Sequence, residues 1–203
     1  MIALGPSANL PPHIELELSL SRLSFTLAIT LGLAVAGCDR GASDAAQEST
    51  ASPAPTGRID ASQAGELFPE FRLSSVSDGI LTSSAYAGHP TLINLWATWC
   101  APCVKEMPLL DQLASDYEGR LKVLTISQDL KGVEAVGPFF ARNEFTHLET
   151  WIDPENYVGD DIGGGFMPTT VLYVRGEEVW RVQGDYDWSS EEARAAIDAA
   201  IAE

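Results

Sequence analysis

The stretch NLWATWCAPCVKEMP, residues 94–108, decides the fold because a buried strand and a helix meet within it. The mostly apolar run at 91–97 is typical of a central strand that is covered on both faces. After the cysteines, apolar side chains recur every three or four residues as far as Tyr117, which predicts a helix with one face in the core. Cys100 and Cys103 therefore stand where a strand passes into a helix.

This position suits a pair of cysteines that exchanges disulfides. The free N–H groups and the macrodipole at a helix N-terminus stabilise a thiolate, so we expect the pKa of Cys100 to lie below the usual value of about 8.5. Cys103, one turn further, belongs to the apolar stripe and should be more buried. We expect Cys100 to attack and Cys103 to resolve the mixed disulfide. A static disulfide is the alternative, but closing so short a loop stabilises a fold only a little.

The rest of the folded part predicts an α/β protein with a mixed sheet. We expect an edge strand before the turn at Asp78-Gly79, a second buried strand after the cysteine helix, then a helix weakened by Gly137-Pro138, a hairpin, and a closing helix capped by Ser189 or Ser190. In this order, the expected ranges are 68–73 for the edge strand, 121–127 for the second buried strand and 133–142 for the helix. The hairpin is expected at 170–174 and 178–183, and the closing helix at 190–202.

Composition and charge exclude several classes. Apolar residues make up 45% of the 203 residues, which is enough for a packed core, and the net charge of −17 argues against a nucleic-acid partner. Three cysteines are too few for a disulfide-stapled scaffold or a four-ligand zinc site. We therefore expect no metal site.

The N-terminal part contains a candidate membrane anchor. After Arg22, the uncharged run at 23–37 is shorter than the roughly 20 residues of a spanning helix, but it fits the apolar region of a secretory signal. The last residues of this run and Cys38, VAGC, resemble the lipobox of bacterial lipoproteins. That resemblance implies cleavage before Cys38 and acylation of this cysteine, which would hold the protein at a membrane. Asp39 resembles an inner-membrane retention signal of enteric bacteria.

The segment that follows, 39–65, contains mainly Ala, Ser, Gly, Pro and charged residues and shows no hydrophobic periodicity. It is typical of a disordered tether with a reach of roughly 30 Å. We thus divide the chain into a signal peptide of lipoprotein type at 1–37, a lipidated cysteine with a tether at 38–66, and a folded domain at 67–203.

The motif around the cysteines resembles the signature of the TlpA/ResA-type thioredoxin-like proteins, which are extracytoplasmic members of the thioredoxin superfamily. The likeness covers 67–203. It implies a thioredoxin-like fold, in which helices flank a central mixed sheet, and the activity of a thiol–disulfide oxidoreductase without a cofactor. It also implies that Trp99 flanks the active surface, whereas Trp96 belongs to the core strand.

A second segment supports this resemblance. Met167-Pro168-Thr169 precedes a strand, and Pro168 matches the cis-proline that lies opposite the cysteines in thioredoxin-like proteins. The resemblance implies that the backbone of Met167 pairs with an extended substrate segment, so Trp99, Met167, Pro168 and Thr169 are the predicted substrate-binding residues. Phe166 stands where many relatives have glycine.

Two polar positions bear on proton transfer. Classical thioredoxins carry an aspartate in the strand before the cysteines, and Asn94 stands there instead. Glu106 occupies a position where TlpA/ResA-type proteins also have glutamate. We expect a partly buried carboxyl with a raised pKa that moves a proton to or from Cys103. The alternative is a surface glutamate paired with a lysine.

The predicted activity is reduction of disulfides in extracytoplasmic proteins, because no histidine between the cysteines stabilises a strongly oxidising thiolate. Relatives act in cytochrome c maturation and in assembly of the copper centre of cytochrome oxidase. A membrane thiol carrier would supply electrons. The alternatives are a disulfide oxidase or isomerase on the same fold, a copper-delivery protein, or a redox-inert binding lipoprotein.

Overall fold

The computed structural model describes residues 54–202 except 78, 87 and 164. The predicted signal peptide, the predicted lipidation site Cys38 and most of the predicted tether lie outside this range. Within it, no helix is both long and apolar enough to cross a membrane.

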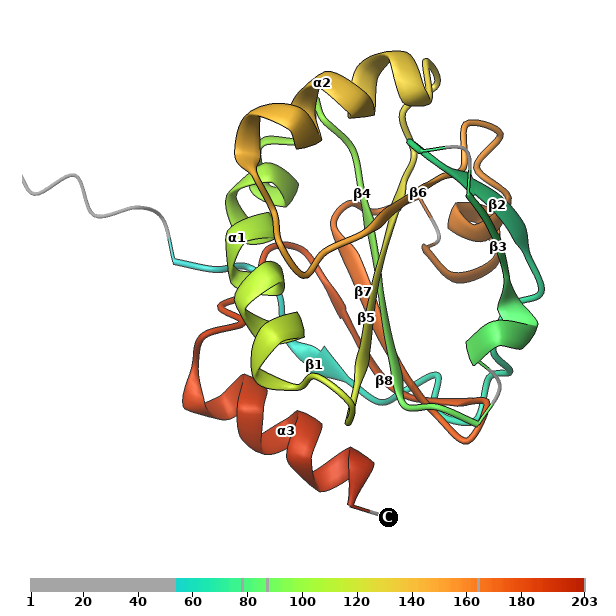
Figure 1. Cartoon of the computed structure of the whole chain (residues 1–203). Helices are drawn as coiled ribbons and strands as arrows, with labels where there is room; N and C mark the ends of the chain where they lie inside the picture. The colour runs from blue at the N-terminus through green and yellow to red at the C-terminus, as the bar shows by residue number, and fades with distance from the viewer. Residues whose placement is uncertain (1–53, 78, 87, 164, 203) are drawn as a thin grey trace, which may run out of the picture. The chain divides into compact units, whose positions relative to one another are not determined.

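A mixed sheet of eight strands forms the centre of the described region (Figure 1). The spatial order is β1-β8-β7-β4-β5-β6-β2-β3, in which β4, β5 and β6 run parallel and the other neighbours run antiparallel. The strands are β1 (Ile59–Asp60), β2 (Arg72–Ser75), β3 (Ile80–Thr82), β4 (Thr91–Trp96), β5 (Lys122–Ser127), β6 (Thr150–Ile152), β7 (Thr169–Val174) and β8 (Glu177–Gln183). All six residues of β4 are buried, as the apolar run predicts for a central strand.

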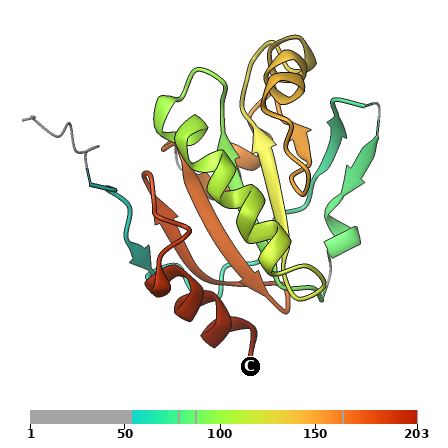
Figure 2. The ribbon, with the colours of Figure 1, turned by 60° about the vertical axis from the view of Figure 1, so that its left-hand side comes forward.

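The helices are α1 (Ala101–Asp116), α2 (Val133–Asn143) and α3 (Glu191–Ile201), with short helical turns η1 (Ser83–Tyr86) and η2 (Gly159–Gly163). Figure 2 shows α1 lying across one face of the sheet. The predicted N-cap of α3 is confirmed at Ser190, whose Oγ accepts a hydrogen bond of 3.1 Å from the amide of Ala193. The α/β architecture expected from the sequence is therefore confirmed.

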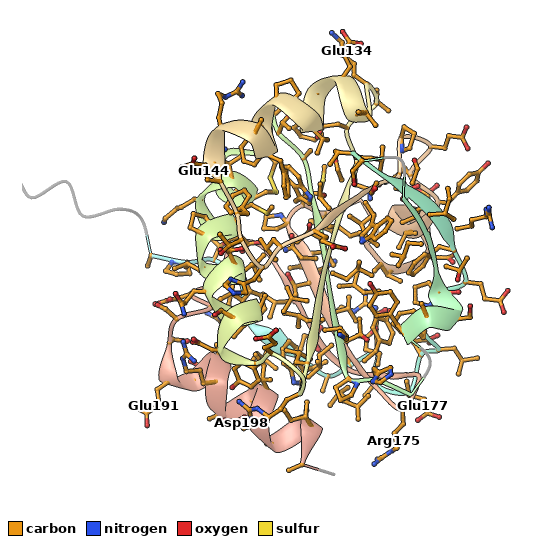
Figure 3. The ribbon with its side chains drawn as sticks, viewed as in Figure 1. Glu134, Glu144, Arg175, Glu177, Glu191 and Asp198 are labelled. Carbon is orange, nitrogen blue, oxygen red and sulfur yellow. A yellow bond between two sulfur atoms is a disulfide. The ribbon has the colours of Figure 1, made fainter. Side chains whose placement is uncertain are left out.

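The core has two parts, one on each face of the sheet, because successive residues of β4 point to opposite faces. Leu92 and Trp96 belong to the cluster that includes the buried residues of α1, α2 and α3. Ile93 and Leu95 belong to the cluster on the other face. The charged side chains labelled in Figure 3 point outward from the ribbon, away from both clusters.

The folded region begins earlier than the expected boundary at Leu67. Ile59 of β1 pairs with Val182 of β8, and the amide of Gly65 donates to the carbonyl of Glu178 at 2.8 Å. The last part of the predicted tether is thus a strap along the edge of β8. A strand of two residues is too short to show hydrophobic periodicity in the sequence. The strap is defined by its backbone pairing with β8.

The edge on the opposite side also differs from expectation. The strand expected at 68–73 is shifted to β2, and β3 rather than β2 forms the edge of the sheet. Neither β3 nor β6 was expected, and each has only three residues.

Candidate active site

The two cysteines lie at the N-terminus of α1 and form a disulfide. Cys100 is the N-cap residue, and its Sγ accepts a contact of 3.4 Å from the amide of Cys103. Cys100 keeps 6% of its surface exposed, whereas Cys103 is fully buried. The order expected from the sequence, with Cys103 deeper than Cys100, therefore holds in the oxidised protein.

A buried aspartate fixes the turn that leads into the cysteines. Asp129, just beyond the end of β5, accepts hydrogen bonds from the amide of Thr98 at 2.9 Å and from its hydroxyl at 2.7 Å. The hydroxyl of Ser127 donates to the same carboxylate at 2.8 Å. Because Thr98 is two residues before Cys100, these bonds set where α1 begins. The sequence motif did not identify Asp129, since it follows a different strand.

Glu106 is buried on the inner side of α1, with 2% of its surface exposed. Its Oε1 accepts from Nδ2 of Asn94 at 2.8 Å, and its Oε2 accepts from Nε1 of Trp188 at 3.2 Å and from the amide of Tyr186 at 3.4 Å. Burial raises the pKa of Glu106 to about 7, although these three hydrogen bonds oppose the shift. The alternative of a surface glutamate paired with a lysine is therefore wrong.

Glu106 is also among the residues that line a cleft beside α1. This cleft has a volume of about 330 Å³, and its walls include Pro102, Lys105, Asp185 and Tyr186. The negative charge of Asp185 also raises the pKa of Glu106.

The loop before β7 contains the predicted cis-proline, because the peptide bond between Met167 and Pro168 is cis. The carbonyl of Pro168 accepts from the amide of Gly184 at 2.9 Å, which fastens the loop to the end of β8. Met167 is half-buried, and no hydrogen bond to its backbone is found among the described residues. Its amide and carbonyl are thus available to an extended segment.

Thr169 does not fit the predicted role of contacting substrate. Its side chain is fully buried, and its hydroxyl donates to the carbonyl of Phe166 at 2.9 Å. The hydroxyl therefore shapes the loop from inside. Phe166 and Trp99, by contrast, expose 62% and 67% of their surfaces, so Trp99 lies at the surface as the resemblance implies.

Trp188 is a partner of Glu106 that the sequence did not identify. Trp188 is buried, and its indole N–H donates to the carboxyl group. The two residues are 82 positions apart, and no motif links them. In the region that the structure covers, no group of three or more His, Cys, Asp or Glu side chains could hold a metal ion.

A central mixed sheet, a cysteine pair that caps a helix and a cis-proline define a thioredoxin-like protein with a redox dithiol. The family model described as the AhpC/TSA family matches residues 64–174. This match covers more than half of the chain, and the chain belongs to that family.

Named relatives agree with this class. The chain is 31% identical over 120 residues to the thiol-disulfide oxidoreductase ResA of Oceanobacillus iheyensis. The matched residues make up 57% of this chain and 62% of the relative. The chain spans less than two thirds of the length of the first curated relatives that it matches. These findings confirm the resemblance to the TlpA/ResA-type thioredoxin-like proteins, the type to which the ResA oxidoreductases belong.

Solved structures share the fold. A putative thiol:disulfide interchange protein DsbE from Chlorobium tepidum is 25% identical with a TM-score of 0.62, covering 68% of this chain and 97% of that protein. The pneumococcal exposed lipoprotein thioredoxin Etrx1 of Streptococcus pneumoniae is 20% identical with a TM-score of 0.58, covering 64% and 99%. The predicted thioredoxin-like fold is thus confirmed.

Proposed function

We propose that the protein is an extracytoplasmic thiol–disulfide oxidoreductase that reduces disulfides in partner proteins. The observation that carries the proposal is the arrangement at the start of α1. Cys100 caps the helix and keeps 6% of its surface exposed, and Cys103 is fully buried one turn further along the helix, three residues before Glu106, whose carboxyl group has a raised pKa. Family membership supports the same chemistry.

The reaction consists of two exchanges at sulfur. The thiolate of Cys100 attacks one sulfur of the substrate disulfide, and the other substrate sulfur leaves as a thiolate that takes a proton from water. Cys103 loses its proton and attacks Sγ of Cys100, which releases the second substrate thiolate and closes the disulfide. Two electrons pass to the substrate, so a thiol carrier has to reduce the disulfide before the next cycle.

Glu106 is the proposed acceptor of the proton from Cys103. It lies three residues further along α1, a spacing that places two side chains on the same side of a helix. A group with a pKa of about 7 is partly deprotonated near neutral pH, so it can accept a proton and return it. The cleft beside Lys105 and Asp185 would carry that proton to solvent.

The location follows from the N-terminal sequence. A signal peptide at 1–37 and acylation of Cys38 would place the domain on the extracytoplasmic side of a membrane, with the inner membrane favoured by Asp39. The similarity to an exposed lipoprotein thioredoxin supports this placement. Because the strap along β8 is folded, the flexible tether would be shorter than the sequence suggests. Partners in this compartment include apocytochromes and proteins of copper-centre assembly.

The redox potential tests the direction of electron flow. Equilibration of the protein with thiol buffers should give a potential nearer the thioredoxin value of about −270 mV than the roughly −120 mV of a strong oxidant. A redox potential near the value of a strong oxidant would contradict the proposed reductase and favour the alternative of a disulfide oxidase. Copper retained in a one-to-one ratio through purification would favour the copper-delivery alternative.

Trapping tests the roles of the two sulfurs. Cys103→Ser should accumulate mixed disulfides with extracytoplasmic proteins through Cys100, and Cys100→Ser should accumulate none. Equal trapping by both variants would contradict the proposed division of roles.

A further inference from the structure

The strap along β8 begins at the cleft that Glu106 lines. Thr56 donates two hydrogen bonds to Oδ1 of Asp185, from its amide at 3.1 Å and from its hydroxyl at 2.8 Å. The amide of Gly57 donates to the carbonyl of Asp185 at 2.9 Å. The two residues before Thr56 form part of the wall of the cleft. Asp185 therefore holds the start of the strap, residues 54–57, with both its side chain and its backbone.

Three consecutive residues after β8 connect the strap to the site. The amide of Gly184 donates to the carbonyl of Pro168 at 2.9 Å, in the cis-proline loop. Asp185 binds the strap, and the amide of Tyr186 donates to Oε2 of Glu106 at 3.4 Å. Neighbouring groups of one short segment thus bind the cis-proline loop, the strap and the buried carboxyl group on α1.

The strap approaches this segment closely because position 57 is a glycine. A Cβ atom on Gly57 would lie 2.6 Å from Cγ1 of Val182 and 2.9 Å from the carbonyl oxygen of Asp185. A Cβ atom on Gly184 would likewise lie 2.6 Å from the hydroxyl oxygen of Thr56. Side chains do not tolerate such short distances, so any larger residue at position 57 would move the strap away from Asp185.

The start of the strap is held without help from the core. Ala54, Pro55 and Thr56 are exposed, and none of the residues 54–57 belongs to the two apolar clusters. Exposed hydrogen bonds contribute little net stability, because water can replace either partner. Segments with few buried apolar contacts open locally at a small part of the free energy of global unfolding. The strap can therefore be released while the domain stays folded.

We propose that Asp185 is a positioning residue of the dithiol site, which keeps the cis-proline loop in place for a substrate segment while the strap is docked on it. This inference rests on the proposed function and adds a control of the same site. With the strap bound, Asp185 is fixed at both ends, and so is the adjacent amide of Gly184 that binds Pro168.

Release of the strap would loosen this arrangement. The carbonyl of Pro168 would lose a fixed donor, and the backbone of Met167 would then be less well ordered for pairing with an extended substrate. In the sequence, the strap leads back to Cys38. The contact at Asp185 would thus connect the proposed anchor to the loop that binds substrate.

The test compares two disulfide substrates. One is a peptide with a single intramolecular disulfide, whose backbone can pair with Met167, and the other is hydroxyethyl disulfide, which has no peptide backbone. Asp185→Ala should slow reduction of the peptide about three- to tenfold, the range that corresponds to the loss of one hydrogen bond. It should leave the rate with hydroxyethyl disulfide unchanged. Asp185→Asn keeps an oxygen that accepts from Thr56, so it should restore the wild-type rate with the peptide.

Asp187→Ala is the matched control for charge. Asp187 lines the same cleft, but its Oδ1 accepts from the amide and the hydroxyl of Ser189. Removing it takes away the same charge and leaves the bonds between Asp185 and the strap in place. The peptide should therefore be reduced at the wild-type rate.

Gly57→Ala moves the strap without altering Asp185 and should reproduce the loss with the peptide. Its control is Gly137→Ala on α2, where a Cβ atom would lie 4.0 Å from Cγ1 of Val133. Gly57→Ala should add no further loss to Asp185→Ala, since both act by releasing the strap. Trypsin cleavage after Arg58 reports the release directly and should be faster in both variants.

An unchanged rate with the peptide in Asp185→Ala or Gly57→Ala, or an equal loss in Asp187→Ala, would overturn the positioning role. Equal losses with both substrates would also overturn it, because they would locate the defect in the dithiol and not in the cis-proline loop. Failure of the wild-type protein to reduce either substrate would remove the proposed function instead. If thermal unfolding shows that Asp185→Ala does not fold, Gly57→Ala decides alone.

Discussion

Nδ2 of Asn94 lies 2.8 Å from Oε1 of Glu106, and the same nitrogen lies 2.8 Å from the hydroxyl oxygen of Thr170. This side chain therefore connects three elements: β4 before the cysteines, α1 that carries them, and β7 after the cis-proline. All three residues are buried. The ionisation state of Glu106 therefore bears on the hydrogen bonds of Asn94, which connect these three elements.

Glu106→Gln should remove a pH dependence of stability. Burial raises the pKa of Glu106 from 4.5 to about 7, so between these values the folded protein holds a proton that the unfolded chain has lost. The free energy of unfolding of the wild-type protein should then fall as pH rises through this window, by up to about 3 kcal/mol.

Urea unfolding at pH 5 and pH 8 checks this prediction. The difference between the two pH values should be smaller in Glu106→Gln, even if the amide costs some stability at both, since it cannot accept all three hydrogen bonds. Glu118→Gln, at an exposed position beyond the end of α1, is the control. Parallel pH profiles for wild type and Glu106→Gln would show that the buried carboxyl does not titrate in this range.

Asn94→Asp should destabilise the protein at pH 8 more than at pH 5. The substitution places a second carboxyl beside Glu106 and removes the donor that now binds it. At pH 5 one shared proton can bridge the two groups, whereas at pH 8 two buried negative charges repel. We expect the free energy of unfolding to fall by about 2 kcal/mol more at pH 8 than at pH 5.

Gln63→Glu, at an exposed position, adds the same charge without a buried neighbour and should show no such difference. The same experiment reports on the thiols. If Glu106 accepts the proton of Cys103, Asn94→Asp should also shift the pH profile of alkylation of the reduced protein. An unchanged pH profile of alkylation would show that Glu106 does not accept the proton of Cys103.

The sequence predicted the centre of the fold and the reactive motif because both are local patterns. A six-residue buried strand such as β4 and a sixteen-residue helix such as α1 are long enough to show hydrophobic periodicity. Strands of two or three residues, β1, β3 and β6, are too short for any period, and their pairing partners define them.

The same division applies to the site. Cys100, Cys103 and Glu106 lie within one motif and were identified from it. Trp188, which donates to Glu106, and Asp129, which holds the turn, reach the site only through packing of distant segments. The burial of Glu106 is likewise tertiary, since the segment that leads into α3 covers it.

Asp129→Ala should slow disulfide exchange and destabilise the protein. It leaves the amide and the hydroxyl of Thr98 without their acceptors, and the cost of such a loss is about 1–3 kcal/mol. The turn before Cys100 would then be less restricted, so the thiolate would be less well placed to attack.

A double-mutant cycle with Thr98→Val isolates this contact. Thr98→Val removes the hydroxyl and keeps the amide, so the two substitutions should be non-additive by roughly 0.5–3 kcal/mol in the free energy of unfolding. Strict additivity would mean that the Thr98 hydroxyl contributes nothing, and that Asp129 stabilises the fold through the Thr98 amide and Ser127.

Glu178→Gln should be the most destabilising of these substitutions. Glu178 and Arg181 form a buried ion pair on β8, with side-chain exposures of 0% and 6%. Removing one charge leaves the guanidinium buried without its partner, which costs about 3–5 kcal/mol. Nη1 of Arg181 also donates to the carbonyl of Ile162 at 2.7 Å, so the pair holds η2, the turn that precedes the cis-proline loop. Asp198→Asn breaks the exposed pair with Arg120 and should change stability by no more than about 1 kcal/mol. If guanidinium unfolding gives similar losses for both variants, the buried pair does not anchor that loop.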